Sequence, residues 1–438
     1  MITFMAYALI VVFMILIMAK KMSPFAALTI IPIIFGVIGQ ILGFWTLDLG
    51  VAALEGVKTT STTAVMLLFA VLFFNLMIDT GLFDPLSNAM IRFAKGDPLK
   101  VMMATVILSA GVSLNGDGTT TMIIVCSAFV PIYRKLRLRM LDLAVLTILS
   151  HSVLNLLPWG GPTARVITVL DLDESQVMRG LVPMIIAATV YMLVVAYIMG
   201  KQERKRLGII EFTPEELNEL TTITDPALMA IRCPKKIWIN FILTAVIIIL
   251  LIWGIIPSAI LFIAGTALGL VINYPSIADQ RSRMEANLPD AGQVAMVVIA
   301  AGIFMGILEG TGMNAAIATS MTSIIPASLG KYWGLIVAIL SAPGTFFLSN
   351  DAFYYGVLPV LAESGASYGF TPLQLGFASL MGQAFHLLSP LVPFIYVLLR
   401  LTDVDMGQWQ KKSVLWAIGI FIIYVIIGIV FGLVPLTA

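Results

Sequence analysis

Two short polar stretches interrupt long apolar runs and carry side chains that could bind ions. The first, Ser113-Leu-Asn-Gly-Asp-Gly-Thr-Thr-Thr121, lies between the hydrophobic segments 101–110 and 122–132. The second, Leu348-Ser-Asn-Asp-Ala352, interrupts the apolar segment 331–362. In hydrocarbon an unpaired backbone group costs on the order of several kcal/mol, so such a break survives only under protein cover or beside a polar cavity. The sequence therefore predicts two polar tips that help to form one buried site.

Each tip carries an aspartate, Asp117 in the first and Asp351 in the second. A carboxylate at membrane depth can carry a proton or ligate a metal ion. The alternative is structural, because each carboxylate could instead cap a helix that begins at the tip. We predict a role in proton or metal coupling for both.

Two further breaks contain proline and glycine, Pro158-Trp-Gly-Gly-Pro-Thr163 and Ser389-Pro-Leu-Val-Pro393. Proline frees a backbone carbonyl, glycine lets the backbone approach a ligand, and each new helix N-terminus offers N–H groups to an anion. The freed carbonyls and the nearby side-chain oxygens suit a cation. The four breaks together suit an anion that is bound with a cation, although kinks without a function are also common in membrane helices.

Arg165 directly follows the first proline-glycine break. An arginine at membrane depth is energetically costly, so a functional role is the default hypothesis for it. Its planar guanidinium group suits a carboxylate. The alternatives are an internal ion pair that holds the two halves of the chain together, or a side chain that snorkels to the outer surface. Of the two histidines, His386 could titrate, bind substrate or simply be packed, whereas for His151 we favour packing.

The composition restricts the class of protein. The 438 residues are 60% hydrophobic and 11% charged, with a mean hydropathy of +1.02. Soluble chains carry roughly twice that charged fraction, so the sequence predicts an all-α polytopic membrane protein. The net charge of +1 argues against a nucleic-acid partner. Cys126 and Cys233 are isolated and form neither a disulfide framework nor a metal-binding spacing.

Catalytic motifs are weak in this sequence. It contains no His-Glu-x-x-His, and Gly365-Ala-Ser-Tyr-Gly369 fits Gly-x-Ser-x-Gly without the strand-to-helix turn that this motif needs. We therefore predict no enzymatic activity and keep a membrane-embedded enzyme as a distant alternative. A channel is also disfavoured, because paired breaks around a buried site suit alternating access.

Ten apolar runs are long enough to cross a membrane, and two more carry the polar tips. The segments 98–133 and 331–362 are too long for one crossing, and we predict that each is a re-entrant hairpin. The predicted crossings are 2–19, 23–43, 62–81, 141–171 and 178–199, then 237–254, 257–273, 291–309, 372–400 and 413–434.

The distribution of basic residues supports this topology. With the N-terminus outside, nearly all of the 25 Lys and Arg residues fall inside. The exceptions are Lys58, Arg179 and Lys331 outside, with Arg165 in the membrane. This matches the positive-inside rule, and it predicts that both termini lie outside.

The two halves of the chain resemble each other. The sequence predicts a first repeat over 1–199, a cytoplasmic linker over 200–236, and a second repeat over 237–438. Asn115-Gly-Asp117 matches Asn350-Asp351, and the stretch 155–162 matches 386–393. Five crossings per half would orient the halves oppositely. An inverted repeat with paired breaks is typical of a secondary transporter whose site lies near the membrane midplane.

Two motifs carry a family resemblance. The stretches 115–121 and Leu157-Pro-Trp-Gly-Gly-Pro-Thr-Ala-Arg165 resemble the signatures of the citrate–metal:proton symporters, called CitMHS, within the ion transporter superfamily. The resemblance implies proton-driven uptake of citrate with a divalent metal ion at the plasma membrane, without a permanently bound cofactor. It also implies a scaffold domain and a transport domain, an elevator-like motion and a homodimer.

The resemblance also assigns residues. Asp117 and Asp351 would couple protons or contact the metal ion of the complex. Sodium-coupled relatives tend to carry Ser-Asn-Thr at both tips, so these aspartates put sodium coupling in doubt. A sodium-coupled di- or tricarboxylate carrier, or an antiporter of the same fold, is the main alternative. The predicted substrate-binding residues are Asn115, Gly116, Thr119, Thr120, Asn155, Gly160, Gly161, Thr163, Arg165, Ser349, Asn350, His386 and Ser389.

Overall fold

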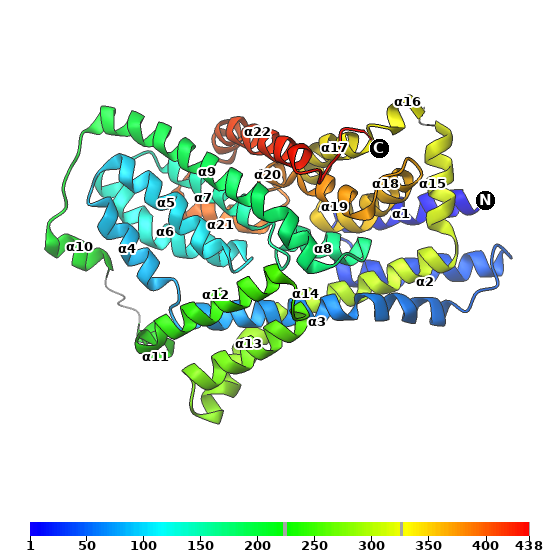
Figure 1. The fold of residues 1–438 in the computed structure, drawn as a ribbon, viewed down its shortest axis with the longest axis horizontal. Helices are drawn as coiled ribbons and strands as arrows, with labels where there is room; N and C mark the ends of the chain where they lie inside the picture. The colour runs from blue at the N-terminus through cyan, green and yellow to red at the C-terminus, as the bar shows by residue number, and fades with distance from the viewer. Residues whose placement is uncertain (222–225, 325–326, 438) are drawn as a thin grey trace.

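The computed structural model describes residues 1–221, 226–324 and 327–437 (Figure 1). Every regular element in these ranges is a helix, which confirms the predicted all-α class. Within them, six helices are long and apolar enough to span a membrane. These are α2 (Pro24–Ile41), α3 (Leu49–Asp79), α9 (Glu174–Leu207), α12 (Ile237–Trp253, continuous with η1, Pro234–Lys236), α14 (Ile277–Gly310) and α22 (Met406–Val430).

Shorter helices complete the chain. Several are apolar, in keeping with a protein that lies largely in the membrane. They include α1 (Ile2–Met18), α4 (Asp84–Ala94), α10 (Pro214–Thr221), α11 (Pro226–Ile231), α13 (Ser258–Asn273), α15 (Met313–Ile324) and α16 (Ala327–Gly330).

Two long helices, α3 and α14, pack along each other and form one layer of the molecule (Figure 1). Their contact is close because glycines meet there. A Cβ built on Gly56 would lie 2.0 Å from the Gly302 carbonyl oxygen, and one on Gly306 would lie 2.2 Å from the Ala52 carbonyl oxygen. Small residues thus let the two backbones touch, as in tightly packed membrane helices.

Both helices begin earlier than their predicted crossings, 62–81 and 291–309. The Asp48 carboxylate caps α3 by accepting hydrogen bonds from the N–H groups of Gly50 and Val51. The helix then continues through the polar run 58–63. Hydropathy marks only the part of a helix that lies in lipid, whereas backbone hydrogen bonding extends the helix beyond it.

Two hairpin-like segments contain the polar tips. The first hairpin consists of α5 (Pro98–Ser113) and α6 (Gly118–Lys135), which pack against each other. The second hairpin consists of α17 (Trp333–Phe347), the π-helix η2 (Ala352–Val357) and α18 (Leu358–Ala366). The helices end and restart at the two polar tips, 114–117 and 348–351, where the sequence predicted breaks.

Two broken helices lie next to the hairpins. The first consists of α7 (Met140–Leu154) and α8 (Gly161–Leu170). The second breaks twice, giving α19 (Pro372–Leu380), α20 (Gln383–His386) and α21 (Pro393–Thr402). The earlier of these two breaks was not predicted. It lies at Gly382, where a Cβ would stand 2.3 Å from the Ser341 carbonyl carbon, so the close approach of α17 requires glycine.

Matched local structure recurs in the two halves. Asp171 ends α8 and Asp403 ends α21, both in the left-handed conformation. Asp173 and Asp405 then cap α9 and α22 by accepting a hydrogen bond from the N–H three residues later. These matched caps are what a repeat of the two halves would produce.

The linker region 200–236 contains the short helix α10. Helix α10 begins at Pro214, and Thr213 and Glu216 exchange hydrogen bonds at its first turn, as in a capping box. Lys135, at the end of the first hairpin, contacts Glu216 at 2.5 Å. The hydrogen bonds from Lys135 and Thr213 lower the pKa of the Glu216 carboxyl.

Candidate functional site

A cavity of about 280 Å³ lies where the two tips and the two proline-containing breaks meet. Elements from both halves of the chain build it, because α21 packs against α6 and α7 while α8 packs against η2 and α19. The structure therefore brings together residues that are far apart in sequence. The predicted site residues that line this cavity are Gly116, Asp117, Asn155, Gly161, Arg165, Ser349, Asn350, Asp351 and His386.

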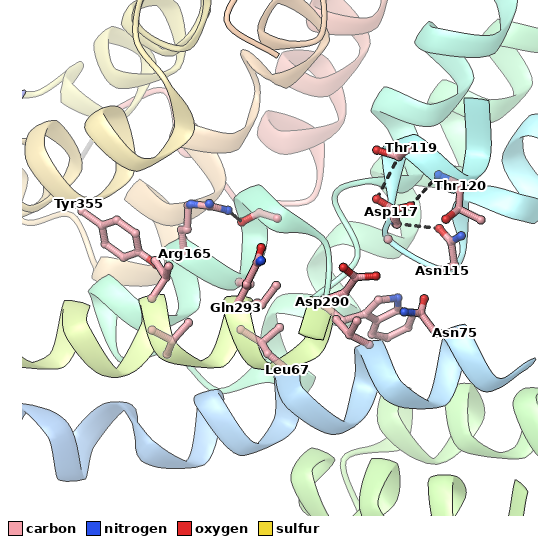
Figure 2. Close-up of a pocket in the computed structure, with 18 residues that line it drawn as sticks. Leu67, Asn75, Asn115, Asp117, Thr119, Thr120, Arg165, Asp290, Gln293 and Tyr355 are labelled. Carbon is pink, nitrogen blue, oxygen red and sulfur yellow. Dashed lines mark hydrogen bonds between the residues drawn. The ribbon is translucent and has the colours of Figure 1, made fainter. Parts of the chain in front are cut away.

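A larger cavity of about 510 Å³ shares Gly116, Asp117, Gly161 and Arg165 with the first. It adds the predicted residues Asn115, Thr119 and Thr120, and it extends to the α3–α14 layer (Figure 2). Sequence reasoning missed the polar residues on its far wall. These are Asn75 on α3 and Asp290 and Gln293 on α14. Tyr355 on η2, which lies beside Arg165, was also missed.

At the first tip, the aspartate caps its own helix. The Asp117 carboxylate accepts hydrogen bonds from the N–H groups of Thr119 at 3.3 Å and Thr120 at 2.6 Å. The Asn115 side-chain oxygen accepts a hydrogen bond from the Asp117 N–H at 2.7 Å. The helix cap that the sequence offered as the alternative role of Asp117 is therefore present. The same carboxylate also lines both cavities.

Trp159 fixes the first tip to the first break. Its Nε1 donates a hydrogen bond to the Leu114 carbonyl at 2.8 Å, and its ring stacks on Phe74 of α3 with centroids 5.1 Å apart. Gly116 has a left-handed φ of 76°, and a Cβ there would lie 3.1 Å from the Trp159 ring. The tip, the break and α3 are therefore in direct contact in this structure.

Arg165 joins the first half of the chain to the second tip. Its Nε donates a hydrogen bond to Asp351 Oδ1 at 2.8 Å, and its Nη2 lies 2.7 Å from the same oxygen. Its Nη1 donates to the Gly161 carbonyl at 2.6 Å. The Arg165 side chain is 23% exposed and that of Asp351 is 16% exposed. The predicted alternative of an ion pair between the halves is therefore present, and Arg165 also faces both cavities.

Polar contacts also hold the second tip in place. The Ser349 hydroxyl accepts a hydrogen bond from the Ala352 N–H at 3.2 Å. Gln383 donates from Nε2 to Asn350 Oδ1 at 3.3 Å and to the Tyr354 hydroxyl at 2.6 Å. The second broken helix and the second hairpin are thus connected by side chains as well as by packing.

His386 connects the second broken helix to α17. Its Nδ1 lies 2.7 Å from the Thr345 carbonyl oxygen. Because a carbonyl only accepts, this contact assigns the proton to Nδ1 and leaves Nε2 as an acceptor in the neutral ring. His386 lines the smaller cavity. His151, in contrast, is buried with its Nδ1 2.9 Å from the Ser113 hydroxyl, and it lines neither cavity.

Three predicted site residues line neither cavity. The Thr163 hydroxyl donates across the first break to the Leu156 carbonyl at 2.7 Å, and the Ser389 hydroxyl accepts from the Leu391 N–H at 3.2 Å. A Cβ on Gly160 would lie 2.0 Å from the Asn155 carbonyl oxygen. In this structure these residues shape the breaks that position the ligand-facing groups.

The described residues contain no group of three or more His, Cys, Asp or Glu side chains placed to hold a metal ion. Carboxylates nevertheless line both cavities. A metal ion in these cavities would need further oxygen ligands, which a chelating substrate can supply.

Comparison with known proteins identifies relatives along nearly the whole chain. The family described as "Citrate transporter" (CitMHS) matches residues 13–382. A protein of Bacillus subtilis (strain 168) named "Citrate transporter" is 43% identical, over 99% of this chain and 100% of that protein. Another protein of that strain, named "Mg(2+)/citrate complex secondary transporter", is 37% identical over 100% of both chains.

A solved structure shares the fold. It is the Alcanivorax borkumensis YdaH transporter, whose crystal structure is described as revealing an unusual topology. The TM-score is 0.53 with 12% sequence identity, and the likeness covers 88% of this chain and 89% of that chain. At this level of identity the match bears on the fold alone.

Proposed function

The chain belongs to the citrate transporter family, and on that premise we propose that it imports citrate as a complex with a divalent metal ion, coupled to protons. It is therefore a transporter and not an enzyme, as the sequence predicts. The observation that carries the proposal is the pair of joined cavities. They combine Arg165 and helix N-termini, which suit an anion, with Asp117 and Asp351, which suit a cation or a proton.

Arg165 and the start of α8 form the anion-binding part of the proposed site. Helix α8 begins at Gly161 with no side chain capping its first N–H groups, and Gly161 lines both cavities. Free N–H groups at a helix N-terminus attract a carboxylate, and the guanidinium can bind it through two hydrogen bonds. A citrate carboxylate would thus be bound beside Arg165.

Asp351 supplies a route for proton coupling. A substrate carboxylate that binds Arg165 would displace Asp351 from its ion pair. The displaced Asp351 carboxylate, left without its cation in a partly buried site, would then bind a proton. Substrate binding and proton binding would therefore favour each other, which is the requirement for symport.

The arrangement of the helices suggests how the site moves. We assign the α3–α14 layer to a scaffold and the hairpins and broken helices to a transport domain. An elevator-like displacement of that domain along the scaffold would carry the cavities across the membrane. We also propose that the protein forms a homodimer in the plasma membrane and that both termini of each chain lie outside.

Uptake by the purified protein in liposomes tests the proposal. Labelled citrate is supplied with Mg²⁺, Ca²⁺ or another divalent ion, or with a chelator, while pH and sodium gradients are varied separately. We expect uptake to require a divalent ion, to be driven by a proton gradient and to be unaffected by sodium. Sodium-driven uptake of metal-free substrate would instead support the alternative, a sodium-coupled carrier.

A further inference from the structure

The larger cavity has two chemically different ends. Arg165 and Tyr355 lie at one end, while Asp117, Asn115 and Asp290 lie toward the other (Figure 2). Gln293 of α14 lies between them (Figure 2). A ligand that fills the cavity would therefore meet a cationic group at one end and two carboxylates at the other.

Asp290 is a carboxylate that lies outside the predicted hairpins and broken helices. It comes from α14, which belongs to neither a hairpin nor a broken helix. Within the described residues it makes no hydrogen bond or salt bridge, whereas Asp79 at the end of α3 is hydrogen-bonded by Asn287 at 2.9 Å. An unpaired carboxylate that faces a cavity is a candidate for binding a cation, because carboxylate oxygens are preferred ligands of hard divalent ions.

A second observation points to an oxygen-bearing ligand at the same end. Asn115 is 4% exposed, and its side-chain Nδ2 has no hydrogen-bond partner among the described residues. A buried amide donor without a partner is costly unless a bound molecule supplies an acceptor. Asn115 lines the same cavity as Asp290. This end therefore offers a donor to a substrate oxygen together with two carboxylates that suit a hard cation.

We propose that Asp290, together with Asp117, receives the divalent metal ion of the transported complex, while Arg165 binds a carboxylate of its citrate. The inference rests on the proposed function and adds a metal-recognising residue on the α14 wall. It follows that Asp290 distinguishes metal-bound from metal-free citrate, because a carboxylate attracts the complexed cation and repels the free tri-anion.

Binding measurements on the purified full-length protein test this assignment. Calorimetry compares Mg²⁺–citrate with citrate in the presence of a chelator, for the wild type, Asp290→Asn and Asp279→Asn. Asp279 is the matched control because it lies in the first turn of the same helix, is exposed and lines neither cavity. For Asp290→Asn we expect affinity for Mg²⁺–citrate to fall about tenfold or more, as when a group near a metal ion is lost.

The outcomes separate this inference from the proposed function. Asp290→Asn should bind chelator-treated citrate at least as well as the wild type, and Asp279→Asn should match the wild type for both ligands. An unchanged affinity of Asp290→Asn for Mg²⁺–citrate would overturn the inference and leave the proposed function intact. An equal loss for both ligands would also overturn it, since the role would then be structural. A wild type that binds metal-free citrate as tightly as the complex would overturn both.

Discussion

The two hairpin tips each carry an aspartate, but the two carboxylates make different contacts. Asp117 caps its own helix through the N–H groups of Thr119 and Thr120. Asp351 instead pairs with Arg165, and the Ser349 hydroxyl accepts the local hydrogen bond at that tip. The carboxylate of the first tip is therefore held by local bonds, while that of the second tip depends on a group from the other half of the chain. This difference makes Asp351 the better candidate for a carboxylate that changes partner during transport.

The two proline-containing breaks also differ in how they are held in place. The first is fixed by Trp159, which bonds to the tip and stacks on α3. In the second break, Pro390 takes the matching position in the repeat, is exposed and has no aromatic ring. The first break is therefore anchored to the α3–α14 layer by an aromatic contact that the second break lacks.

The largest effect is expected from Arg165→Ala. It removes the cation that contacts the second tip and that would bind the substrate carboxylate, so citrate uptake should fall to background in liposomes. Removing one partner of a partly buried ion pair lowers the free energy of unfolding by roughly 3–5 kcal/mol. Size-exclusion chromatography must therefore verify that the purified variant is folded and not aggregated. Arg165→Lys keeps the charge and loses the planar fork, and it should recover only part of the uptake. Normal uptake by a well-folded Arg165→Ala variant would exclude the proposed role.

The next prediction compares the two aspartates directly. Asp351→Asn should slow uptake and flatten its dependence on pH, because an amide cannot take up the proton that the displaced carboxylate would bind. Asp117→Asn should leave the shape of the pH profile unchanged, because asparagine caps helices about as well as aspartate. The measurement is initial uptake rate against pH for both variants. If only Asp117→Asn altered the profile, proton coupling would belong to the first tip.

The difference between the breaks is tested by Trp159→Leu, which removes from the first break the aromatic ring and the side-chain donor that the second break does not have. The variant loses a hydrogen bond and a stacked aromatic pair, so it should be destabilised by about 2 kcal/mol. A fall in melting temperature of the purified protein would report this loss. Leu391→Ala in the second break is the control and should change the melting temperature little, because Leu391 is 40% exposed. Equal effects of the two substitutions would contradict the proposed anchoring.

Much of the site was visible in the sequence because polar residues stand out in an apolar chain. Asp117, Arg165 and Asp351 drew notice in that way, and both cavities are built around them. The pairing of Arg165 with Asp351 could only be raised as one alternative, since their contact depends on how the two halves pack. Sequence spacing carries no information about that distance.

The missed residues are single polar positions in otherwise regular helices. Asn75 lies in an apolar run without any break, and Asp290 directly precedes the predicted crossing 291–309. Neither position disturbs the helix, so no local pattern distinguishes it from an interfacial residue. Only the packing of α3 and α14 against each other and against α8 places these two side chains on a shared cavity wall.

The smallest expected effect on stability comes from the capping of the first helix of each hairpin. Asp97 caps α5 through the Leu99 N–H at 3.1 Å and accepts a hydrogen bond from Arg204 Nε at 2.8 Å. In contrast, Tyr332, which precedes α17, makes no capping hydrogen bond with its side chain. Burial acts to raise the pKa of Asp97, but the hydrogen bonds from Arg204 and Leu99 outweigh it and hold the pKa below the ordinary value of 3.8.

Asp97→Asn keeps a capping side chain and loses the charge, so it should destabilise the protein by about 1 kcal/mol at pH 7. Because the folded-state pKa is lowered, this stabilisation is present above pH 3.8 and is lost as the pH falls through the folded value. Melting temperatures of wild type and variant in detergent should therefore differ at neutral pH and converge in acid. A difference of the same size at pH 7 and well below pH 3.8 would show that the charge of Asp97 does not stabilise the first hairpin.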